Sequence, residues 1–341
     1  MKTSFSFIVF LFLILYGQAQ QNENQYSVLF YNVENLFDIK NDSITDDDEF
    51  TPEGERHWTY KRLNVKLQNT AKIILSLSEW KVPTLVGLCE IENRYVLEKL
   101  LKETPLKTVP YKIIHKESPD FRGIDVALLY NDTQFYPLNY EYYPLIKRNG
   151  EMMNSREILY VSGVMGGVDT IHVFVNHWPS RYSGVMETRE LRKEAASLLH
   201  AKIELVLKNT PDAKIIVLGD FNDQPNDDSI EKCLQAQAVT TELVSHELYN
   251  LSEDWEANGQ GTLKYQSQWF VFDQVIVSGA MLVAKEGLYA QPEWATICKL
   301  PYLLESDEKY GGFKPKRTYT GYKYNGGFSD HLPVLLKLQV R

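Results

Sequence analysis

Two short stretches of the sequence place metal-binding and proton-transferring side chains directly beside apolar runs. LGDFND, which contains Asp220 and Asn222, follows one apolar run, and FSDHLP, which contains Asp330 and His331, precedes another. Carboxylates and amides bind hard cations, and an imidazole exchanges protons near neutral pH. Both stretches therefore carry the side chains that metal-assisted hydrolysis needs.

Polar residues interrupt or end several other apolar stretches. They are Asn32 after VLFY, Glu90 after VGLC, Asn176 and His177 after HVFV, and Asp273 within VFDQVIV. Each one alone has a simple structural explanation, such as a turn or a packed histidine. That explanation is poorer for the whole set, because carboxylates are rarely fully buried without partners. The repetition predicts one site at which the strand ends meet.

The oxygen-rich side chains of this set suit a hard divalent cation. Asn32, Glu90, Asp220 and Asp330 offer carboxylate or amide oxygens, which Mg²⁺, Mn²⁺ and Ca²⁺ prefer. The sequence has no Cys/His cluster, which argues against zinc. A hard cation and two histidines can neutralise phosphate charge, activate water and protonate a leaving group. Phosphodiester hydrolysis is the chemistry that fits best.

Alternating strands and helices must position these side chains. Strand-like stretches occur at 26–32, 84–91, 111–115, 124–130, 157–165, 170–176, 214–220, 270–278 and 333–340. Apolar residues at helical spacing predict helices over 60–79 and 187–208. Turn signals at Asn131-Asp132 and Gly166-Gly167 predict hairpins in the middle of the chain. This order predicts an α/β (α+β) fold of two packed mixed β-sheets flanked by helices, in a single domain over 20–341.

Two long polar stretches lie outside these elements. The acid-rich stretch 38–57 is predicted to be a surface loop, and its acidic run does not match a calcium-binding loop. The stretch 308–327 mixes cations with rings, including Lys316, Arg317 and Tyr319, directly before the Asp330 motif. It is predicted to contact substrate beside the active site. Such residues suit phosphates and bases, and they also suit a phospholipid headgroup or a self-packed loop.

The N-terminal segment indicates where the protein acts, and the net charge disfavours one class of function. Residues 1–19 combine Lys2, an apolar run and a small-x-small ending, which predicts a signal peptide removed after Ala19 and export to the periplasm or the medium. No second apolar segment is long enough to cross a bilayer, so the mature chain is predicted to have no transmembrane segment. The net charge is −9, and −10 without Lys2, which disfavours a protein that coats nucleic acid.

The cysteines are too few and too widely spaced to define a structural framework. Cys89, Cys233 and Cys298 match neither a zinc pattern nor a set of disulfides. Cys89 lies inside an apolar run and is predicted to be a small buried hydrophobe. We therefore expect the fold not to depend on any cysteine pairing.

Seven motifs resemble a known family, and they occur in that family's order. They are FYNVENLFD, GLCEIENR, RGIDVALLY, VNHWPSR, LGDFND, FDQVIVS and SDHLPV, between Tyr26 and Leu338. The sequence resembles the endonuclease/exonuclease/phosphatase superfamily, with the fold of pancreatic deoxyribonuclease, and it looks most like the secreted bacterial branch. The resemblance implies a four-layer α/β/β/α sandwich.

The same resemblance implies a metal site. Glu90 would be the principal metal ligand, Asn32 would help to shape the site, and Asp330 would complete the shell around metal and phosphate. Mg²⁺, or Mn²⁺ or Ca²⁺, is the expected cofactor.

The resemblance also implies roles in proton transfer and phosphate binding. His331 would accept a proton from the attacking water and would be oriented by Asp273. Asp220 and Asn222 would hold the phosphate, the nucleophile or a second metal. His177 would stabilise the phosphoryl oxygens or protonate the leaving oxygen, and a neighbouring group would keep it charged.

Four neighbouring residues have two interpretations each. Asp125 is a candidate partner for His177 or an ordinary residue at a strand edge. Arg122 and Arg181 either grip phosphate or form surface salt bridges. Glu92 is interpreted as structural, although it is close enough to Glu90 in sequence to assist at the metal site.

The combined prediction is an exported divalent-metal-dependent phosphoesterase that hydrolyses phosphodiester bonds, acting as an endonuclease or exonuclease on nucleic acid. A sphingomyelinase-like phospholipid phosphodiesterase and a phosphomonoesterase share the same catalytic residues and remain alternatives. A non-catalytic binding protein on the same fold is disfavoured because Glu90, His177 and His331 are all present. No stable protein partner is inferred.

Overall fold

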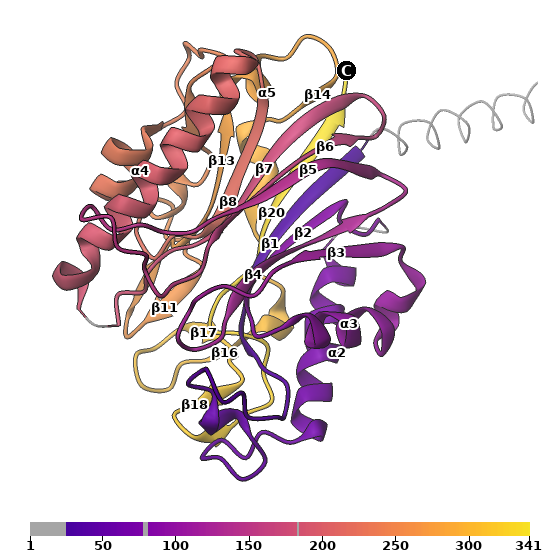
Figure 1. The fold of residues 1–341 in the computed structure, drawn as a ribbon, viewed down its shortest axis with the longest axis vertical. Coiled ribbons are helices and arrows are strands. Elements are labelled where there is room, and N and C mark those ends of the chain that lie inside the picture. The colour runs from indigo at the N-terminus through magenta and orange to yellow at the C-terminus, as the bar shows by residue number, and fades with distance from the viewer. Residues whose placement is uncertain (1–24, 78–80, 183) are drawn as a thin grey trace, which may run out of the picture.

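The computed structural model describes residues 25–77, 81–182 and 184–341, and its core consists of two seven-stranded β-sheets packed face to face (Figure 1). The first sheet has the order β14-β20-β1-β2-β4-β3, with β15 pairing with β20, and the second has the order β5-β6-β7-β8-β13-β10-β9. Strand pairs β1–β2, β7–β8 and β9–β10 are parallel and the other pairs within the two sheets are antiparallel, so both sheets are mixed. The predicted signal peptide, 1–19, lies outside the described residues.

The strands of the two sheets have the following bounds. The first sheet contains β1 (Gln25–Leu36), β2 (Leu85–Ile91), β3 (Tyr111–His115), β4 (Asp125–Asn131), β14 (Leu288–Tyr289), β15 (Ala295–Ile297) and β20 (Val334–Val340). The second contains β5 (Phe135–Tyr143), β6 (Ile158–Met165), β7 (Asp169–His177), β8 (Lys214–Asp220), β9 (Ala236–Gln237), β10 (Leu248–Asn250) and β13 (Asp273–Ser278).

The helices cover the outer faces of the sheets. They are α2 (Tyr60–Ser76), α3 (Arg94–Lys102), α4 (Val185–Asn209) and α5 (Gly279–Val283), with short helical turns at Asp48–Phe50, Pro105–Thr108, Ser229–Leu234, Glu253–Trp255, Pro292–Trp294 and Pro301–Leu303. Helices α2 and α3 lie on one side of the molecule and α4 on the other (Figure 1). None of the helices among the described residues has the length and apolar character needed to cross a membrane.

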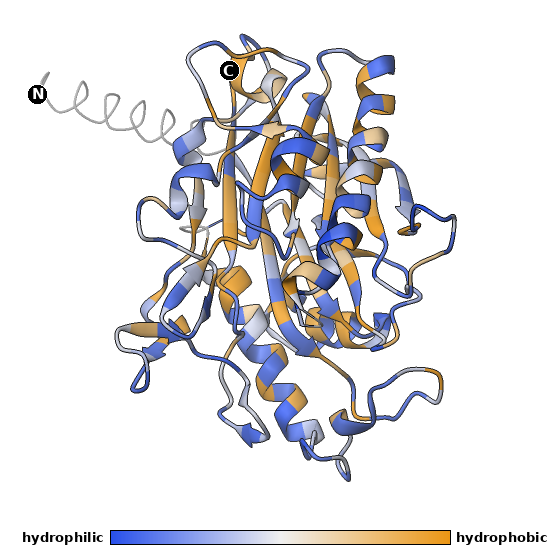
Figure 2. Ribbon diagram, turned by 90° about the vertical axis from the view of Figure 1, so that its left-hand side faces the viewer, coloured by the Kyte–Doolittle hydropathy of each residue, from blue (hydrophilic) through white to orange (hydrophobic). Residues whose placement is uncertain are grey.

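Three apolar layers separate the four structural layers. One lies between α2, α3 and the first sheet, one between the two sheets, and one between α4 and the second sheet. Figure 2 shows the hydrophobic stretches on the strands at the centre and the polar surface on the outer turns of the helices. The predicted four-layer α/β/β/α sandwich is therefore confirmed.

Three small hairpins extend one end of the sandwich. They are β11 (Leu263–Tyr265) with β12 (Gln268–Phe270), β16 (Leu304–Ser306) with β17 (Phe313–Pro315), and β18 (Tyr319–Thr320) with β19 (Lys323–Tyr324). All three lie at the lower end of the sheets in Figure 1. The stretch 308–327, predicted as a loop, therefore contains short strands.

Candidate active site

Three neighbouring strands of the second sheet bring three of the predicted catalytic side chains into register. Asp220 at the end of β8 pairs with His177 at the end of β7 and with Asp273 at the start of β13. His177 Nε2 lies 3.6 Å from Asp220 Oδ2. All three residues are buried, so the carboxylates depend on partners within the protein.

His331 joins this group from the segment that leads into β20. Its Nδ1 lies 2.6 Å from Asp273 Oδ2, and its Nε2 lies 3.7 Å from Asp220 Oδ2. Ser329 Oγ accepts the His331 N–H at 3.0 Å and donates to the Asn32 carbonyl at 2.7 Å, which ties the segment to β1. One oxygen of Asp220 therefore faces two imidazoles.

The first sheet contributes Asn32 and Glu90 through two irregular strands. The register of β1 shifts after Asn32, and Glu90 itself is skipped in the pairing between β2 and β4. Such bulges re-aim side chains. Asn32 Nδ2 donates to Asp220 Oδ2 at 3.1 Å and to Glu90 Oε1 at 3.5 Å, while the Asn35 N–H donates to Glu90 Oε2 at 2.9 Å. These bonds join the two sheets at the site.

Left-handed backbone is concentrated at the same place. The φ angles are 53° at Glu34, 56° at Asn35, 62° at Glu90 and 52° at Asn222. Residues other than glycine rarely adopt positive φ, and such strain gathers at functional sites where surrounding contacts enforce it. The unusual backbone therefore lies at the same meeting point of the two sheets as the polar side chains.

Asp330 is linked to Glu34 by one arginine. Arg317 Nη2 donates to Asp330 Oδ2 at 3.0 Å, and Arg317 Nε donates to Glu34 Oε1 at 2.8 Å. Although burial acts in the opposite direction, the guanidinium of Arg317 lowers the pKa of Asp330. The buried Glu34 carboxyl has a raised pKa because of burial and the nearby Asp330 charge. Asp330 therefore carries its charge beside a cation.

The two imidazoles have opposite pKa shifts. Burial, Arg156 and Arg122 lower the pKa of His177 well below its usual range. Burial lowers the pKa of His331 too, but the carboxylates of Asp273 and Asp220 outweigh it and raise that pKa well above the usual range. These directions do not support the predicted division, in which His331 is a neutral base and His177 a charged acid.

Residues 27–340 match the endonuclease/exonuclease/phosphatase family. The chain belongs to this family. Its members are hydrolases that act on phosphodiester bonds, and they usually use divalent metals. No curated protein matches the chain.

Solved structures of this family share the fold at low sequence identity. The catalytic domain of human Nocturnin, with a bound sulfate anion, is 14% identical with a TM-score of 0.57, covering 93% of this chain and 95% of that chain. A family member from Bacteroides thetaiotaomicron is 14% identical with a TM-score of 0.54, covering 93% and 98%. TDP2 from D. rerio, complexed with a single-strand DNA product, is 15% identical with a TM-score of 0.52, covering 93% and 99%.

Arg181 holds the turn that follows Asp220 through hydrogen bonds. Its Nε donates to the Asn222 carbonyl at 2.6 Å, and its Nη2 donates to Asp223 Oδ1 at 2.6 Å. The Asn222 N–H in turn donates to Asp220 Oδ1 at 3.0 Å, and the Asn222 side chain donates to the Trp178 carbonyl at 3.1 Å. The structure assigns these groups to holding the turn, so it does not support Arg181 as a phosphate grip.

Asp125 does not pair with His177, which corrects that prediction. Its carboxylate accepts the Ser118 N–H at 2.7 Å and lies 3.0 Å from His115 Nε2. Nδ1 of His177 is buried and has no hydrogen-bond partner among the described residues. The strand pairing explains the error, because β3 and β4 are neighbours and bring His115 next to Asp125, whereas His177 belongs to the other sheet.

The other predicted substrate contacts differ in their exposure. Arg122 lies 3.8 Å from the buried Asp120 and is half-buried. Lys316 is half-buried, and its main chain pairs with Leu303 and Phe328. Tyr319 is 4% exposed and therefore is not the surface contact that was predicted. Its ring packs beside Trp58, and its hydroxyl donates to the Arg56 carbonyl at 2.9 Å.

Sequence reasoning missed Glu34, Arg56 and Lys66 near the site. Nζ of the buried Lys66 donates to Thr318 Oγ1 at 2.5 Å and to the Phe328 carbonyl at 2.6 Å. Burial lowers the pKa of Lys66 to about 8. Lys66 lies between Leu63 and Leu67 on the apolar face of the predicted helix, and this position could have indicated from the sequence that it is a buried cation.

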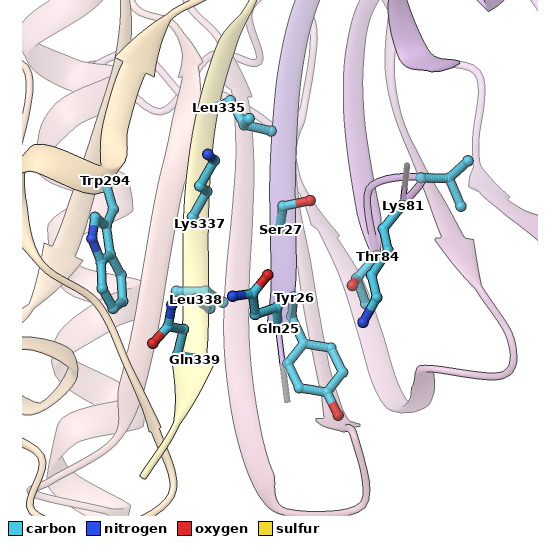
Figure 3. Close-up of a pocket in the computed structure, with 11 residues that line it drawn as sticks. Gln25, Tyr26, Ser27, Lys81, Thr84, Trp294, Leu335, Lys337, Leu338 and Gln339 are labelled. Atoms are coloured by element: carbon cyan, nitrogen blue, oxygen red, sulfur yellow. The ribbon is translucent and has the colours of Figure 1, made fainter. Parts of the chain in front are cut away.

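A cavity of about 320 Å³ lies away from this site. It opens near the first residues of β1 and the last residues of β20, where Ser27 and Lys337 project from neighbouring strands (Figure 3). The candidate site lies at the opposite ends of the same two strands, next to Asn32 and His331. The larger cavity therefore does not coincide with the candidate site.

Proposed function

We propose that this family member is a divalent-metal-dependent phosphoesterase that hydrolyses phosphodiester bonds in nucleic acid. One observation carries the proposal. His177 and His331 lie 3.6 and 3.7 Å from the same Asp220 oxygen, which also accepts a hydrogen bond from Asn32 beside Glu90. Imidazoles and carboxylates at such distances can position water and move protons around a phosphate.

The donor chemistry of the site fits a hard cation. Glu90, Asp330 and Asn32 would hold Mg²⁺, or Mn²⁺ or Ca²⁺, through oxygen atoms. Among the described residues no three His, Cys, Asp or Glu side chains form a cluster that could hold a metal. Mg²⁺ is commonly held by one or two carboxylates, with water and substrate phosphate completing the shell. When bound, the ion would neutralise phosphate charge and favour ionisation of a water molecule.

The protein's own groups then have separate tasks in the proposed reaction. Asp273 fixes the His331 ring through Nδ1, which leaves Nε2 to donate to a phosphoryl oxygen. Asp220, held by the Asn222 N–H, is placed to accept a proton from the attacking water. His177 supports Asp220 from the other side. In this proposal Asp220 accepts the proton from the attacking water, a role that was predicted for His331. The change agrees with the raised pKa of His331.

Two further points support the choice of substrate and location. TDP2, which has the same fold, was solved with a single-strand DNA product. Arg317 bonds to Asp330, and Phe313 and Tyr322 of the same stretch 308–327 are exposed; such cations and rings suit phosphates and bases. We propose export to the periplasm or the medium from the apolar N-terminal segment ahead of residue 20.

The test is hydrolysis by the mature protein of plasmid DNA, RNA, sphingomyelin and a soluble phosphomonoester, in parallel. Each substrate is tested with Mg²⁺, Mn²⁺ or Ca²⁺ and with EDTA. Metal-dependent cleavage of DNA or RNA is the expected result. Cleavage of sphingomyelin alone or of the monoester alone would show that the substrate is that compound class and not nucleic acid. No hydrolysis of any of the four substrates would favour a non-catalytic protein.

A matched pair of variants tests the metal site. Glu90→Gln removes a carboxylate at the meeting point of the sheets, and EDTA-sensitive hydrolysis is expected to be abolished with little change in thermal midpoint. Glu92→Gln is the control, because Glu92 binds the Asp38 N–H at 2.5 Å and takes no part in the proposed site. Unchanged turnover in Glu90→Gln would contradict the assignment.

A further inference from the structure

A second, smaller cavity opens directly beside the catalytic carboxylates. Its volume is about 170 Å³, and its walls include Glu34, Asn35, Phe50, Arg56, Arg317 and Tyr319. The Asn35 N–H donates to Glu90, and Arg317 bonds to Asp330. Two residues that line the cavity, Asn35 and Arg317, therefore bond to proposed metal ligands.

Arg56 is held rigidly in this cavity wall by three aromatic rings. Its guanidinium carbon lies 4.9 Å from the ring centre of Phe50, 5.1 Å from that of Tyr319 and 5.6 Å from that of Tyr322. Its Nη1 donates to the Gly321 carbonyl at 3.2 Å. Stacking on aromatic faces is a common way to orient an arginine. The cation is thus in place before any ligand arrives.

The acidic groups around the cavity are already engaged. Glu34 accepts bonds from Arg317 Nε at 2.8 Å and from the Thr318 N–H at 2.7 Å, so both of its oxygens are used. Glu49 Oε1 lies 2.9 Å from Arg56 Nε. Arg56 and Arg317 both retain solvent access, with side chains 20% and 44% exposed. Their remaining donors are available to an anion.

The size of the cavity limits the ligand to one group. Pockets for complete small molecules generally occupy about 300–1,000 Å³, and this cavity is smaller. Arginine binds phosphate through paired N–H donors. We propose that the cavity binds a second phosphate of the substrate, next to the phosphate that is hydrolysed, through Arg56 and Arg317. This inference rests on the proposed phosphodiesterase function and deepens it.

The consequence is selection by the number of phosphates. A nucleic acid has phosphates on both sides of each nucleotide, whereas sphingomyelin and simple diesters have only one. Occupying the second site would tighten the binding of nucleic acid and would not affect the binding of sphingomyelin or simple diesters. Arg56, which does not contact the proposed metal ligands, would thus determine specificity without taking part in the chemical step.

Three dinucleotides separate these cases: d(TpT), and d(TpT) carrying a further phosphate at its 5′ or its 3′ end. For the wild-type chain, kcat/KM is expected to be higher for one of the two phosphorylated forms. Arg56→Gln is expected to lower kcat/KM for that form by about tenfold or more, because a charged hydrogen bond is lost. The value for unphosphorylated d(TpT) should change less than twofold, and Arg56→Lys should restore part of the preference.

Arg62→Gln is the matched control. Arg62 also stacks on a ring of the same hairpin, 4.5 Å from the centre of Tyr324, and donates to the His57 carbonyl at 2.9 Å, but it does not line the cavity. It is expected to keep the preference for the phosphorylated form. Loss of that preference in both variants would assign the effect to loop packing and overturn the proposal.

Two other outcomes would also decide the proposal. An equal loss on all three dinucleotides in Arg56→Gln would show that Arg56 acts on the reaction itself, which overturns the second site. If the wild-type chain hydrolyses none of them, the plasmid DNA and RNA assays decide the proposed function, and binding of the same dinucleotides by calorimetry decides the second site. Tighter binding of one phosphorylated form, lost in Arg56→Gln, would support the second site, and equal binding of all three would refute it.

Discussion

At the scale of single residues, the site depends on how one imidazole is held. Asp273 is fully buried, and its Oδ2 lies 2.6 Å from His331 Nδ1, whereas its Oδ1 has no hydrogen-bond partner among the described residues. A carboxylate in this position fixes the tautomer of a histidine and stabilises its charged form. The charge of Asp273, as distinct from its shape, is therefore expected to matter for turnover.

Asp273→Asn tests this expectation, because it keeps the shape and removes the charge. The value of kcat is expected to fall by about 10²- to 10⁴-fold, the range seen when a histidine loses its orienting partner, while the thermal midpoint changes little. Asp169→Asn is the control, since Asp169 lies at the other end of β7 and pairs with Lys214. A loss of only a few-fold in Asp273→Asn would place the proton transfer elsewhere.

Residue types and their order predicted most of the site, and local contacts decided the rest. Asn32, Glu90 and Asp220 were found because each ends an apolar run, and the structure joins them by hydrogen bonds. Glu34 was missed because its left-handed backbone lies within an irregular part of β1, between Asn32 and Leu36, that the sequence does not reveal. The pairing of Asp125 was wrong because it depends on which strands are neighbours, which a single sequence does not give.

At the scale of elements, a column of rings crosses strands β5, β6 and β7 beneath α4. Tyr143 stacks near Tyr160 at 6.2 Å, and Tyr160 stacks near His172 at 6.0 Å. The Tyr160 hydroxyl lies 2.8 Å from His172 Nδ1, and Lys202 of α4 covers Tyr143 at 4.1 Å. This column ties the helix to the sheet through an imidazole whose pKa is lowered by burial.

His172 gives the stability a predictable dependence on pH. Burial lowers the pKa of His172 in the folded chain, so at acidic pH the unfolded chain binds more protons and folding is disfavoured. The thermal midpoint is expected to fall as the pH drops below about 6.5, the usual histidine value. His172→Gln keeps a neutral acceptor for Tyr160 and should flatten this part of the curve. Parallel curves for the two proteins from pH 7 to pH 5 would contradict the argument.

The elements themselves were predicted best where apolar spacing was regular. The helix predicted over 187–208 is α4, and the helix predicted over 60–79 ends at Ser76 in the structure. Helix α3 was not predicted, although Asn93 caps it and Val96 and Leu100 mark its buried face. The acid-rich stretch 38–57 was predicted to lie on the surface, but Phe50 stacks on Phe37 at 4.2 Å and is buried.

At the scale of the whole molecule, the two sheets must approach closely enough to share one site. Gly87 in the middle of β2 lies where they meet, because a Cβ at this position would come within 2.7 Å of Leu218 Cδ1 and 3.3 Å of Val175 Cγ1 from the other sheet. The sequence predicted two packed sheets from the number and spacing of strands. It did not predict their order, since the pairs β1–β20 and β8–β13 join strands far apart in the chain.

Gly87→Ala therefore tests the packing between the sheets. Overfilling a close-packed core costs about 1–3 kcal/mol, so the free energy of unfolding in denaturant is expected to fall by that amount. Leu218→Val removes a methylene from the facing strand and costs about 1 kcal/mol alone. If the two side chains meet as the structure shows, the double variant should be more stable than the sum of the single changes predicts, by about 0.5 kcal/mol or more. Additive losses would mean that Gly87→Ala destabilises strand β2 itself, and that the side chains at positions 87 and 218 do not interact across the two sheets.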